Sequence, residues 1–280
     1  MTFSLAVVDP LHGLLGGACA SRSLAVGNAV LTVDPSRGVT ISQAATNRKL
    51  HGAMLHGLGG AGAPGRGAPG RGVSAGGAGG QSASGLDGGG QGASGLDGGG
   101  QCASGLDADV ATPEQALASA LATDDQPERR QCGVLDLTGR GAAHTGAGTV
   151  GWAGHRIGAP ALASVQDGIR RPPTLALGNC LAGPEVLDAM CAAVLTPTTG
   201  DELARQLVDA LLAGDAAGGD IRGKQSAAVL VARIDPEAQW PYTSIVDLRV
   251  DDHPDAIAVL ADLLDAWIEA GTERRLVGRV

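Results

Sequence analysis

The chain has very few aromatic residues, with three Trp, one Tyr and one Phe among its 280 residues. A core without rings must be built from Ala, Val and Leu, so its stability has to come from many small contacts. So few rings cannot form a stacking platform for single-stranded nucleic acid. With 29 acidic and 20 basic residues, the net charge of -9 also disfavours contact with phosphates. We therefore expect no nucleic-acid partner.

Long apolar runs are also missing. No stretch approaches the ~18 apolar residues that a membrane span requires. The N-terminus lacks the basic region and the long apolar run of a signal peptide. The five cysteines are an odd number without a Cys-x-x-Cys pair, which favours reduced thiols. We expect a cytoplasmic protein with no membrane partner.

Glycine is abundant, with 46 residues, and it is concentrated in one low-complexity segment at residues 59–108. The sequence Ala-Ser-Gly-Leu-Asp recurs there from Ala83, Ala93 and Ala103. One Leu in each repeat cannot supply the apolar face that stacked repeats need. We interpret the segment as a flexible insertion within a single domain that spans residues 1–280.

Alternating β-prone and helical patterns fill the rest of the chain. Strands are predicted at residues 3–8, 14–20, 28–33, 38–44, 133–137, 142–145, 225–233 and 244–250. Helices are predicted at residues 49–58, 113–122, 184–195, 201–213 and 254–270, with a capping box at Thr112 and Gln115 and a stop at Gly214. This order indicates a layered α+β fold with mainly antiparallel sheet. Two stacked sheets between helix layers would use every element, but the pattern alone also allows a two-layer arrangement.

Thr2 is the most informative residue, because a strand that starts at residue 3 would hold it rigidly at the edge of a sheet. Removal of Met1 would leave Thr2 with a free α-amine beside its hydroxyl. An α-amine has a pKa of roughly 7.7 to 8.0, so near neutral pH it can accept the hydroxyl proton. One residue would then supply both nucleophile and base. The alternative is an ordinary strand start.

Short motifs along the whole chain resemble those of the bacterial domain-of-unknown-function 1028 family. They are Met-Thr-Phe-Ser at the start, Ala20-Ser21-Arg22, Gln43-Ala44-Ala45-Thr46-Asn47, Ala143-His144-Thr145-Gly146, Trp152-Ala153-Gly154-His155, Gly178-Asn179, Gly218-Gly219-Asp220 and Gln225-Ser226-Ala227-Ala228. The family is regarded as similar to N-terminal-nucleophile (Ntn) hydrolases. The resemblance implies a four-layer αββα sandwich with Thr2 as the candidate nucleophile, but it names no substrate.

Three further residues are candidates for the catalytic machinery. Asn47 and Asn179 could donate amide hydrogens to a developing oxyanion, although Asn also commonly caps turns and helices. Arg22 could lower the pKa of the amine or bind a substrate carboxylate, and the alternative is a surface charge.

Other polar residues are candidates for substrate contacts. They are His144, Trp152, His155, Asp220 and Gln225. His144 and His155 lack a third and a fourth ligand at useful spacing, so we expect a pocket or structural role rather than a metal site. We expect no cofactor. Asp220 precedes a strand that should lie next to the N-terminal strand if the family layout holds.

These expectations converge on an amidohydrolase that uses Thr2 to attack a small-molecule amide or imide. The alternative is a non-catalytic binding or structural module with the same fold. A third possibility is a metal hydrolase that uses His144 and His155. A homo-oligomer is left open by the sequence.

Overall fold

The computed structural model describes residues 2–59, 111–158, 165–166 and 169–277. The insertion predicted at residues 59–108 lies almost entirely outside these residues. The chain starts with a hairpin of strand β1 (Thr2–Asp9) and strand β2 (Leu14–Ser21). Along β1 the side chains alternate: Phe3, Leu5 and Val7 join one apolar core, whereas Ala6 and Val8 join another. The first strand is therefore buried on both faces.

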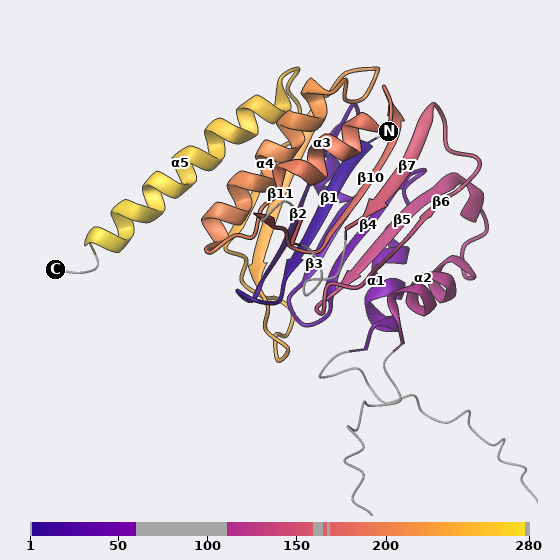
Figure 1. The fold of residues 1–280 in the computed structure, drawn as a ribbon, viewed down its shortest axis with the longest axis horizontal. Helices are drawn as coiled ribbons and strands as arrows, with labels where there is room; N and C mark the ends of the chain where they lie inside the picture. Colours follow the sequence, from indigo (N-terminus) through magenta and orange to yellow (C-terminus); the bar gives the residue numbers. More distant parts are fainter. Residues whose placement is uncertain (1, 60–110, 159–164, 167–168, 278–280) are drawn as a thin grey trace, which may run out of the picture. The chain divides into compact units, whose positions relative to one another are not determined.

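Two antiparallel sheets form the centre of the molecule (Figure 1). The larger sheet has six strands in the order β12-β11-β2-β1-β10-β7, so β1 lies between β2 and β10. Its other strands are β7 (Trp152–Ile157), β10 (Thr174–Leu181), β11 (Ser226–Arg233) and β12 (Val246–Val250). The smaller sheet has four strands in the order β3-β4-β5-β6. These strands are β3 (Leu31–Asp34), β4 (Gly38–Ala44), β5 (Arg130–Asp136) and β6 (Gly141–Thr145). Two short strands, β8 (Val165–Gln166) and β9 (Ile169–Arg170), pair separately.

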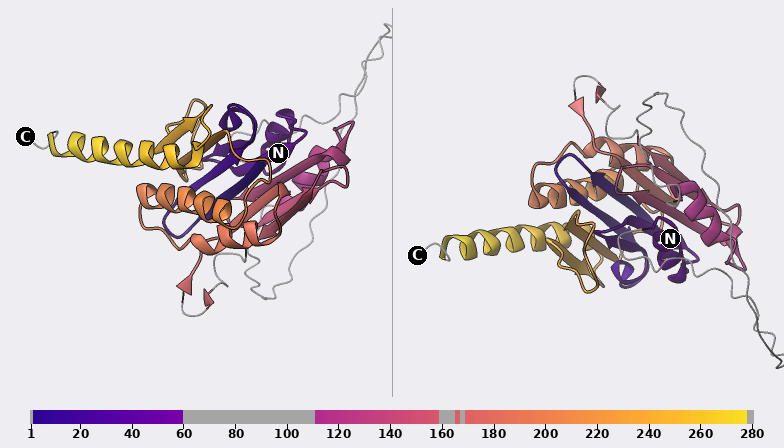
Figure 2. Two further views of the ribbon diagram at one scale, coloured as in Figure 1. Left: turned by 90° about the horizontal axis from the view of Figure 1, so that it is seen from above. Right: turned by 90° about the horizontal axis from the view of Figure 1, so that it is seen from below.

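The described residues form five α-helices, four of which pack on the two larger sheets while the fifth begins against one of them. They are α1 (Lys49–Gly57), α2 (Pro113–Leu121), α3 (Glu185–Ala193), α4 (Gly200–Ala216) and α5 (Ala256–Val277), and short 3-10 turns occur at Val26–Asn28 and Pro127–Arg129. One apolar core joins α3, α4 and the start of α5 to the six-stranded sheet. A second core lies between the two sheets, and a third joins α1 and α2 to the four-stranded sheet. Helix α5 runs beside α4 and then away from the sheets (Figure 2).

The structure confirms the predicted start of α2 and corrects the predicted end of α4. Thr112 and Gln115 form the reciprocal capping box at α2. Gly214, predicted to terminate α4, lies inside the helix, which continues to Ala216. A Cβ at Gly214 would lie 2.7 Å from Met190 Cγ of α3, so this glycine allows two helices to approach closely. The chain leaves the helix through Gly218 and Gly219, which both have positive φ.

Other expectations about strands need correction. Strand β11 pairs with β2 and not with β1, because β10 occupies the other side of β1. Strand β3 begins at Leu31, because residues 26–28 form a 3-10 turn instead of the predicted strand start. Strands β7 and β10 were not predicted. No helix in the described ranges is long and apolar enough to cross a membrane.

Candidate functional site

Thr2 lies at the start of a central strand and is almost completely buried, with 4% of its surface exposed. It pairs with Ser21 of β2, and on its other side the pairing of β1 with β10 ends at Phe3 and Gly178, one residue before Asn179. Its side chain shares the face of Ala6 and Val8, which is the face toward the four-stranded sheet. The hydroxyl of Thr2 therefore lies at one end of the space between the two sheets.

The Thr2 hydroxyl has a defined orientation. Its Oγ1 donates a hydrogen bond to Ser21 Oγ over 3.2 Å. The same Ser21 oxygen accepts a hydrogen bond from the Ser23 amide over 3.0 Å, which holds Ser21 against the turn after β2. These two hydrogen bonds fix the orientation of the Thr2 hydroxyl.

Behind Thr2 lies a buried network of amide side chains, which we call the amide network: Ser4, Gln43, Gln131 and Asn179. Gln43 Nε2 donates to the carbonyl oxygen of Thr2 over 3.2 Å and to Gln131 Oε1 over 2.8 Å. Asn179 Nδ2 donates to the same Gln131 oxygen over 2.9 Å, and Ser4 Oγ donates to Gln43 Oε1 over 2.7 Å. The network joins strands of both sheets at Thr2.

Two backbone carbonyls determine how every amide in the network is oriented. Gln131 Nε2 donates to the carbonyl oxygens of Gly178 and Gly154 over 2.8 and 3.0 Å. A reversed Gln131 amide would place oxygen against oxygen, so its Oε1 must face Gln43 and Asn179. Asn179 must therefore present Nδ2 to Gln131, which turns its Oδ1 elsewhere. Asn179 is 1% exposed, and its Oδ1 has no hydrogen-bond partner among the described residues.

Backbone strain occurs directly beside this network. Ala44 has φ of 69° and Cys180 has φ of 56°, and these residues follow Gln43 and Asn179. Left-handed backbone is costly for residues with a Cβ, by about 1–2 kcal/mol each. Such strain concentrates at functional sites, where the fold holds side chains in a required place. The ends of β4 and β10, which carry Gln43 and Asn179, therefore both contain a residue with strained backbone.

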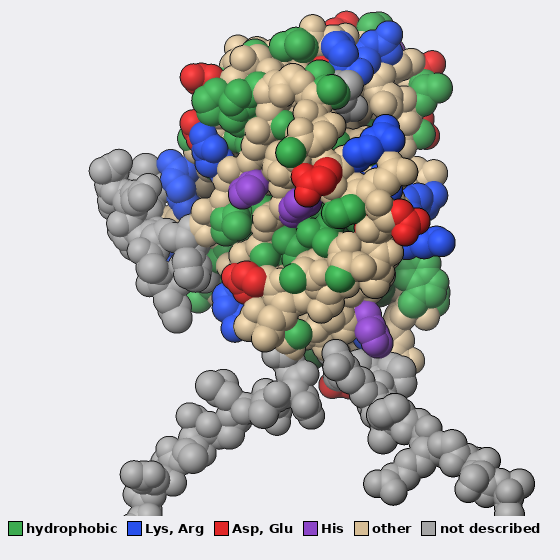
Figure 3. Space-filling model, turned by 90° about the vertical axis from the view of Figure 1, so that its right-hand side faces the viewer, with side chains coloured by type: hydrophobic (Ala, Val, Ile, Leu, Met, Phe, Trp, Pro, Cys, Tyr) green, Lys and Arg blue, Asp and Glu red, His purple; other side chains and the backbone are tan. Residues whose placement is uncertain are grey.

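His155 connects to the network through one hydroxyl. Its Nδ1 lies 3.0 Å from Thr145 Oγ1, which accepts a hydrogen bond from Gln131 Nε2 over 3.1 Å. Burial, Arg156 and His144 lower the pKa of His155, so the ring is neutral near pH 7. Thr145 can then donate its proton to Nδ1. On the face shown in Figure 3, two histidine side chains lie near each other beside an acidic group and among hydrophobic groups, whereas Lys and Arg lie nearer its margins.

Trp152 belongs to β7 but points to the other side of the six-stranded sheet. Its ring packs against the core beneath α3 and α4. It also lies over Gly154, where a Cβ would come within 2.9 Å of the ring. The substrate contact expected for Trp152 would therefore have to be made at its half-buried outer edge.

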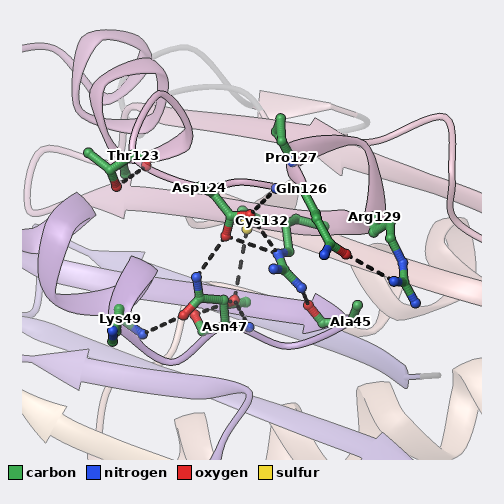
Figure 4. Close-up of polar contacts among 12 residues, drawn as sticks. Ala45, Asn47, Lys49, Thr123, Asp124, Gln126, Pro127, Arg129 and Cys132 are labelled. Carbon is green, nitrogen blue, oxygen red and sulfur yellow. Dashed lines mark hydrogen bonds and ion pairs between the residues drawn. The ribbon is translucent and has the colours of Figure 1, made fainter.

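Asn47 and His144 do not join Thr2. Asn47 Nδ2 donates to Asp124 Oδ2 over 2.7 Å, and its Oδ1 accepts from the Lys49 amide at the start of α1 (Figure 4). His144 Nε2 donates to the carbonyl oxygen of Pro127 over 3.0 Å, and its strand partner is Cys132. Cys132 faces α1 and α2, on the far side of the four-stranded sheet from Thr2. Asn47 was expected either to donate to an oxyanion or to cap a turn or helix, and this placement fits the capping role.

Asp124 organises the polar cluster around Asn47. Its carboxylate accepts from Arg130 Nε over 3.0 Å and from the Gln126 amide over 2.7 Å. These contacts hold the pKa of Asp124 at about 2, with the Arg130 hydrogen bond as the largest cause and the Asn47 hydrogen bond adding to it. The cluster fixes the ends of α1 and α2 to β5, which is a structural role.

Arg22, Gln225 and Asp220 lie at the same end of the six-stranded sheet as Thr2, but they form separate contacts. Arg22 Nη1 donates to Gln225 Oε1 over 2.5 Å, and Gln225 Nε2 donates to Asp252 over 2.9 Å. Arg22 and Asp252 are exposed, and Gln225 is half-buried. Asp220 is buried and pairs with Arg222 over 2.9 Å, and its backbone bridges to Leu181, two residues after Asn179. They could contact a ligand at the rim of the site.

A hollow of about 520 Å³ lies at the opposite end of the six-stranded sheet. It is lined by residues that include Pro35, Arg233, Asp235 and Tyr242. Arg233 pairs with Leu14, whereas Ser226 pairs with Ser21 beside Thr2, so the length of β11 separates the hollow from Thr2. No group of three or more His, Cys, Asp or Glu that could hold a metal ion occurs in the part of the chain that is described.

Comparisons with known proteins place the chain in a family. The model of a family described as "Family of unknown function (DUF1028)" matches residues 2–66 and 91–260. The chain belongs to the DUF1028 family. A crystal structure of a protein of this family, SPO2555 from Silicibacter pomeroyi, is similar with a TM-score of 0.63 and 27% identity over 95% of this chain and 85% of that chain. No curated protein matches the chain. Membership of the family confirms the resemblance of the motifs and leaves the activity open.

Proposed function

We propose that this DUF1028 protein is an N-terminal-nucleophile amidohydrolase with a four-layer αββα sandwich. Three separate apolar cores, between the sheets and outside each of them, support the proposed layering. The observation that carries the proposal is the placement of Thr2. A residue that is one position from the chain end is 4% exposed, with its hydroxyl aligned by Ser21 and its carbonyl held by Gln43.

In the proposed reaction Thr2 Oγ attacks the carbonyl carbon of a small-molecule amide or imide. The α-amine of Thr2, free after removal of Met1, accepts the hydroxyl proton and then passes it to the leaving nitrogen. The C–N bond breaks and an ester of Thr2 forms. Water, deprotonated by the same amine, attacks this ester and releases the carboxylic acid, which restores Thr2.

The amide network has two roles in this mechanism. Gln43 fixes the Thr2 backbone, so the hydroxyl and the amine keep one geometry through both steps. Asn179 uses one Nδ2 hydrogen for Gln131, and its second Nδ2 hydrogen is our candidate donor to the oxyanion. Arg22 and Gln225 at the rim are our candidates for contacts with a polar substrate.

A non-catalytic binding or structural module is the second candidate, and one observation favours it. Thr2 and Asn179 are both buried, with exposed fractions of 4% and 1%. A substrate could reach Thr2 Oγ only if the rim of the site opens. In this second case Thr2 and the amide network would serve to join the two sheets.

Covalent labelling distinguishes these two functions. We would treat the purified protein with a β-lactone, an electrophile that acylates a nucleophilic hydroxyl, and locate the label by peptide mass spectrometry. The amidohydrolase predicts labelling of Thr2 in the wild type and in Thr2→Ser. It predicts no label in Thr2→Val, which keeps the size and the chain end but lacks the hydroxyl. Equal labelling of wild type and Thr2→Val, or no label in either, would favour the non-catalytic module.

A further inference from the structure

The buried oxygen of Asn179 points to a donor that the network itself does not supply. Asn179 Oδ1 has no partner among the described residues, although the residue is 1% exposed. The carbonyls of Gly154 and Gly178 fix the orientation of Gln131 and thereby that of Asn179. Exchanging the nitrogen and the oxygen of the Asn179 amide therefore cannot resolve the unpaired oxygen. Leaving a buried acceptor unpaired costs about 1–3 kcal/mol, so such an atom calls for a specific partner.

A group that can gain hydrogens is the nitrogen of Thr2, a residue that Gln43 and Gln131 connect to Asn179. The last printed pair of β1 and β10 is Phe3 with Gly178, and Thr2 and Asn179 are the next residues of the two strands beyond it. Directly opposed residues of antiparallel strands have Cα atoms about 4.5–5.5 Å apart, within reach of a side chain such as Asn. Removal of Met1 converts the Thr2 amide, which has one hydrogen, into an amine or ammonium group with two or three.

We propose that Asn179 Oδ1 accepts a hydrogen bond from the free α-amine of Thr2. This inference rests on the proposed function, because it requires removal of Met1. Asn179 is then a positioning residue for the general base: it turns the nitrogen lone pair, or the ammonium hydrogens, relative to Thr2 Oγ1. Gln131 in turn holds Asn179 in the orientation that makes the acceptor available.

The space between the sheets also holds titratable and charged groups, among them Arg249 of β12, whose charge acts on Cys19. In the described part of the chain, Cys19 of β2 and His155 of β7 face the same space between the sheets, and burial raises the pKa of Cys19 to about 12. The charged groups of α3 and α4 lie on the other face of the six-stranded sheet. Asp124 and Arg130 lie beyond the four-stranded sheet, and exposed Arg22 is bound to Gln225.

The test measures the pKa of the Thr2 amine. The protein would be labelled with 13C-threonine, its intact mass would establish that Met1 is absent, and the Thr2 carbon shifts would be titrated. Because an acceptor favours the ammonium form, we expect Asn179→Leu to lower the pKa of the amine by about one pH unit. Ser4→Ala, which removes a hydrogen bond at the other end of the amide network, should leave it unchanged.

The outcomes distinguish a failure of the proposed function from a failure of this inference. Retention of Met1 would overturn the proposed function and with it this inference. If Met1 is absent and the amine has the same pKa in wild type and Asn179→Leu, this inference is overturned but the proposed function is not. If Asn179→Leu does not fold, a crystal structure of the processed wild type decides: we expect Thr2 nitrogen within about 3.2 Å of Asn179 Oδ1. A water on Oδ1 with the amine turned away would contradict the proposal.

Discussion

Asn179 of the six-stranded sheet donates a hydrogen bond to Gln131 of the four-stranded sheet over 2.9 Å, in the buried space between them. Gln131 accepts a second hydrogen bond from Gln43 and donates to two backbone carbonyls of β7 and β10. A single side chain thus satisfies polar groups from three strands, β4, β7 and β10. The polar end of the space between the sheets depends on Gln131 more than on any other member of the amide network.

Replacing Gln131 should therefore be severe. Gln131→Leu fills the space but leaves buried amide and carbonyl groups of Gln43, Asn179, Gly154 and Gly178 without partners. We expect a loss of about 3–5 kcal/mol in the free energy of unfolding, measured by urea denaturation. Ser4→Ala, which removes one hydrogen bond from the same network, should cost about 1 kcal/mol. Similar losses for the two variants would refute the central place of Gln131.

The strained backbone at Ala44 leads to a stabilising substitution. Ala44 has φ of 69°, a region where glycine has no Cβ penalty. Ala44→Gly should raise the free energy of unfolding by about 1 kcal/mol. The matched control is Ala53→Gly inside α1, which should lower it by about 1 kcal/mol. Destabilisation by both substitutions would show that Ala44 is not strained in solution.

The Asp124 carboxylate makes stability depend on pH in the acid range. Its pKa falls from 3.8 to about 2 on folding, chiefly through the hydrogen bond from Arg130. Its contribution is therefore complete above the unfolded pKa and is lost as the pH falls through the folded value. We expect Asp124→Asn to reduce the free energy of unfolding by about 2 kcal/mol at pH 6, and this difference should shrink between about pH 4 and pH 2.

Asp125→Asn is the matched control for that experiment, because Asp125 is the adjacent residue and is exposed. Its effect should stay within about 0.5 kcal/mol at each pH. Urea denaturation of the three proteins across the acid range gives the comparison. A constant difference between wild type and Asp124→Asn down to pH 2 would contradict the assigned role of the Arg130 pair.

The buried thiols should be unreactive in the folded protein. Burial raises the pKa of Cys19 to about 12 and that of Cys132 to about 11. The thiolate is the reactive form, and at pH 8 it amounts to about one part in ten thousand for Cys19. Alkylation with iodoacetamide followed by peptide mapping should leave both sites unmodified until urea is added. Rapid modification of native Cys19 would show that the space between the sheets opens.

Local signals in the sequence predicted much of the fold, because caps, turns and periodicity act over a few residues. Thr112 and Gln115 gave the start of α2 correctly, and the α+β class with mainly antiparallel sheets is confirmed. The prediction that α4 ends at Gly214 was wrong. This glycine lies against Met190 of α3, and a local sequence pattern cannot reveal a contact between two helices. The neighbours of β1 were likewise set by pairing over long distances in the chain.

The candidate site was predictable only in part. Thr2 stood out because of its position, and Asn179 because of a family motif, and Gln43 and Gln131 connect the two residues. Gln131, Ser21 and Ser4 were missed. The one available signal was the alternation of Thr2 and Ser4 with apolar residues in β1, which placed two hydroxyls on one face. Asn47 was chosen for its amide, but the fold uses that amide for Asp124.

The most direct measurement of the central claim is the intact mass of the purified protein together with its N-terminal sequence. The proposed reaction requires that Thr2 carry the free α-amine, since the same residue provides the attacking oxygen and the base. It predicts a chain that is lighter by one methionine residue and begins at Thr2. A chain that retains Met1 in its folded, purified form would contradict the account.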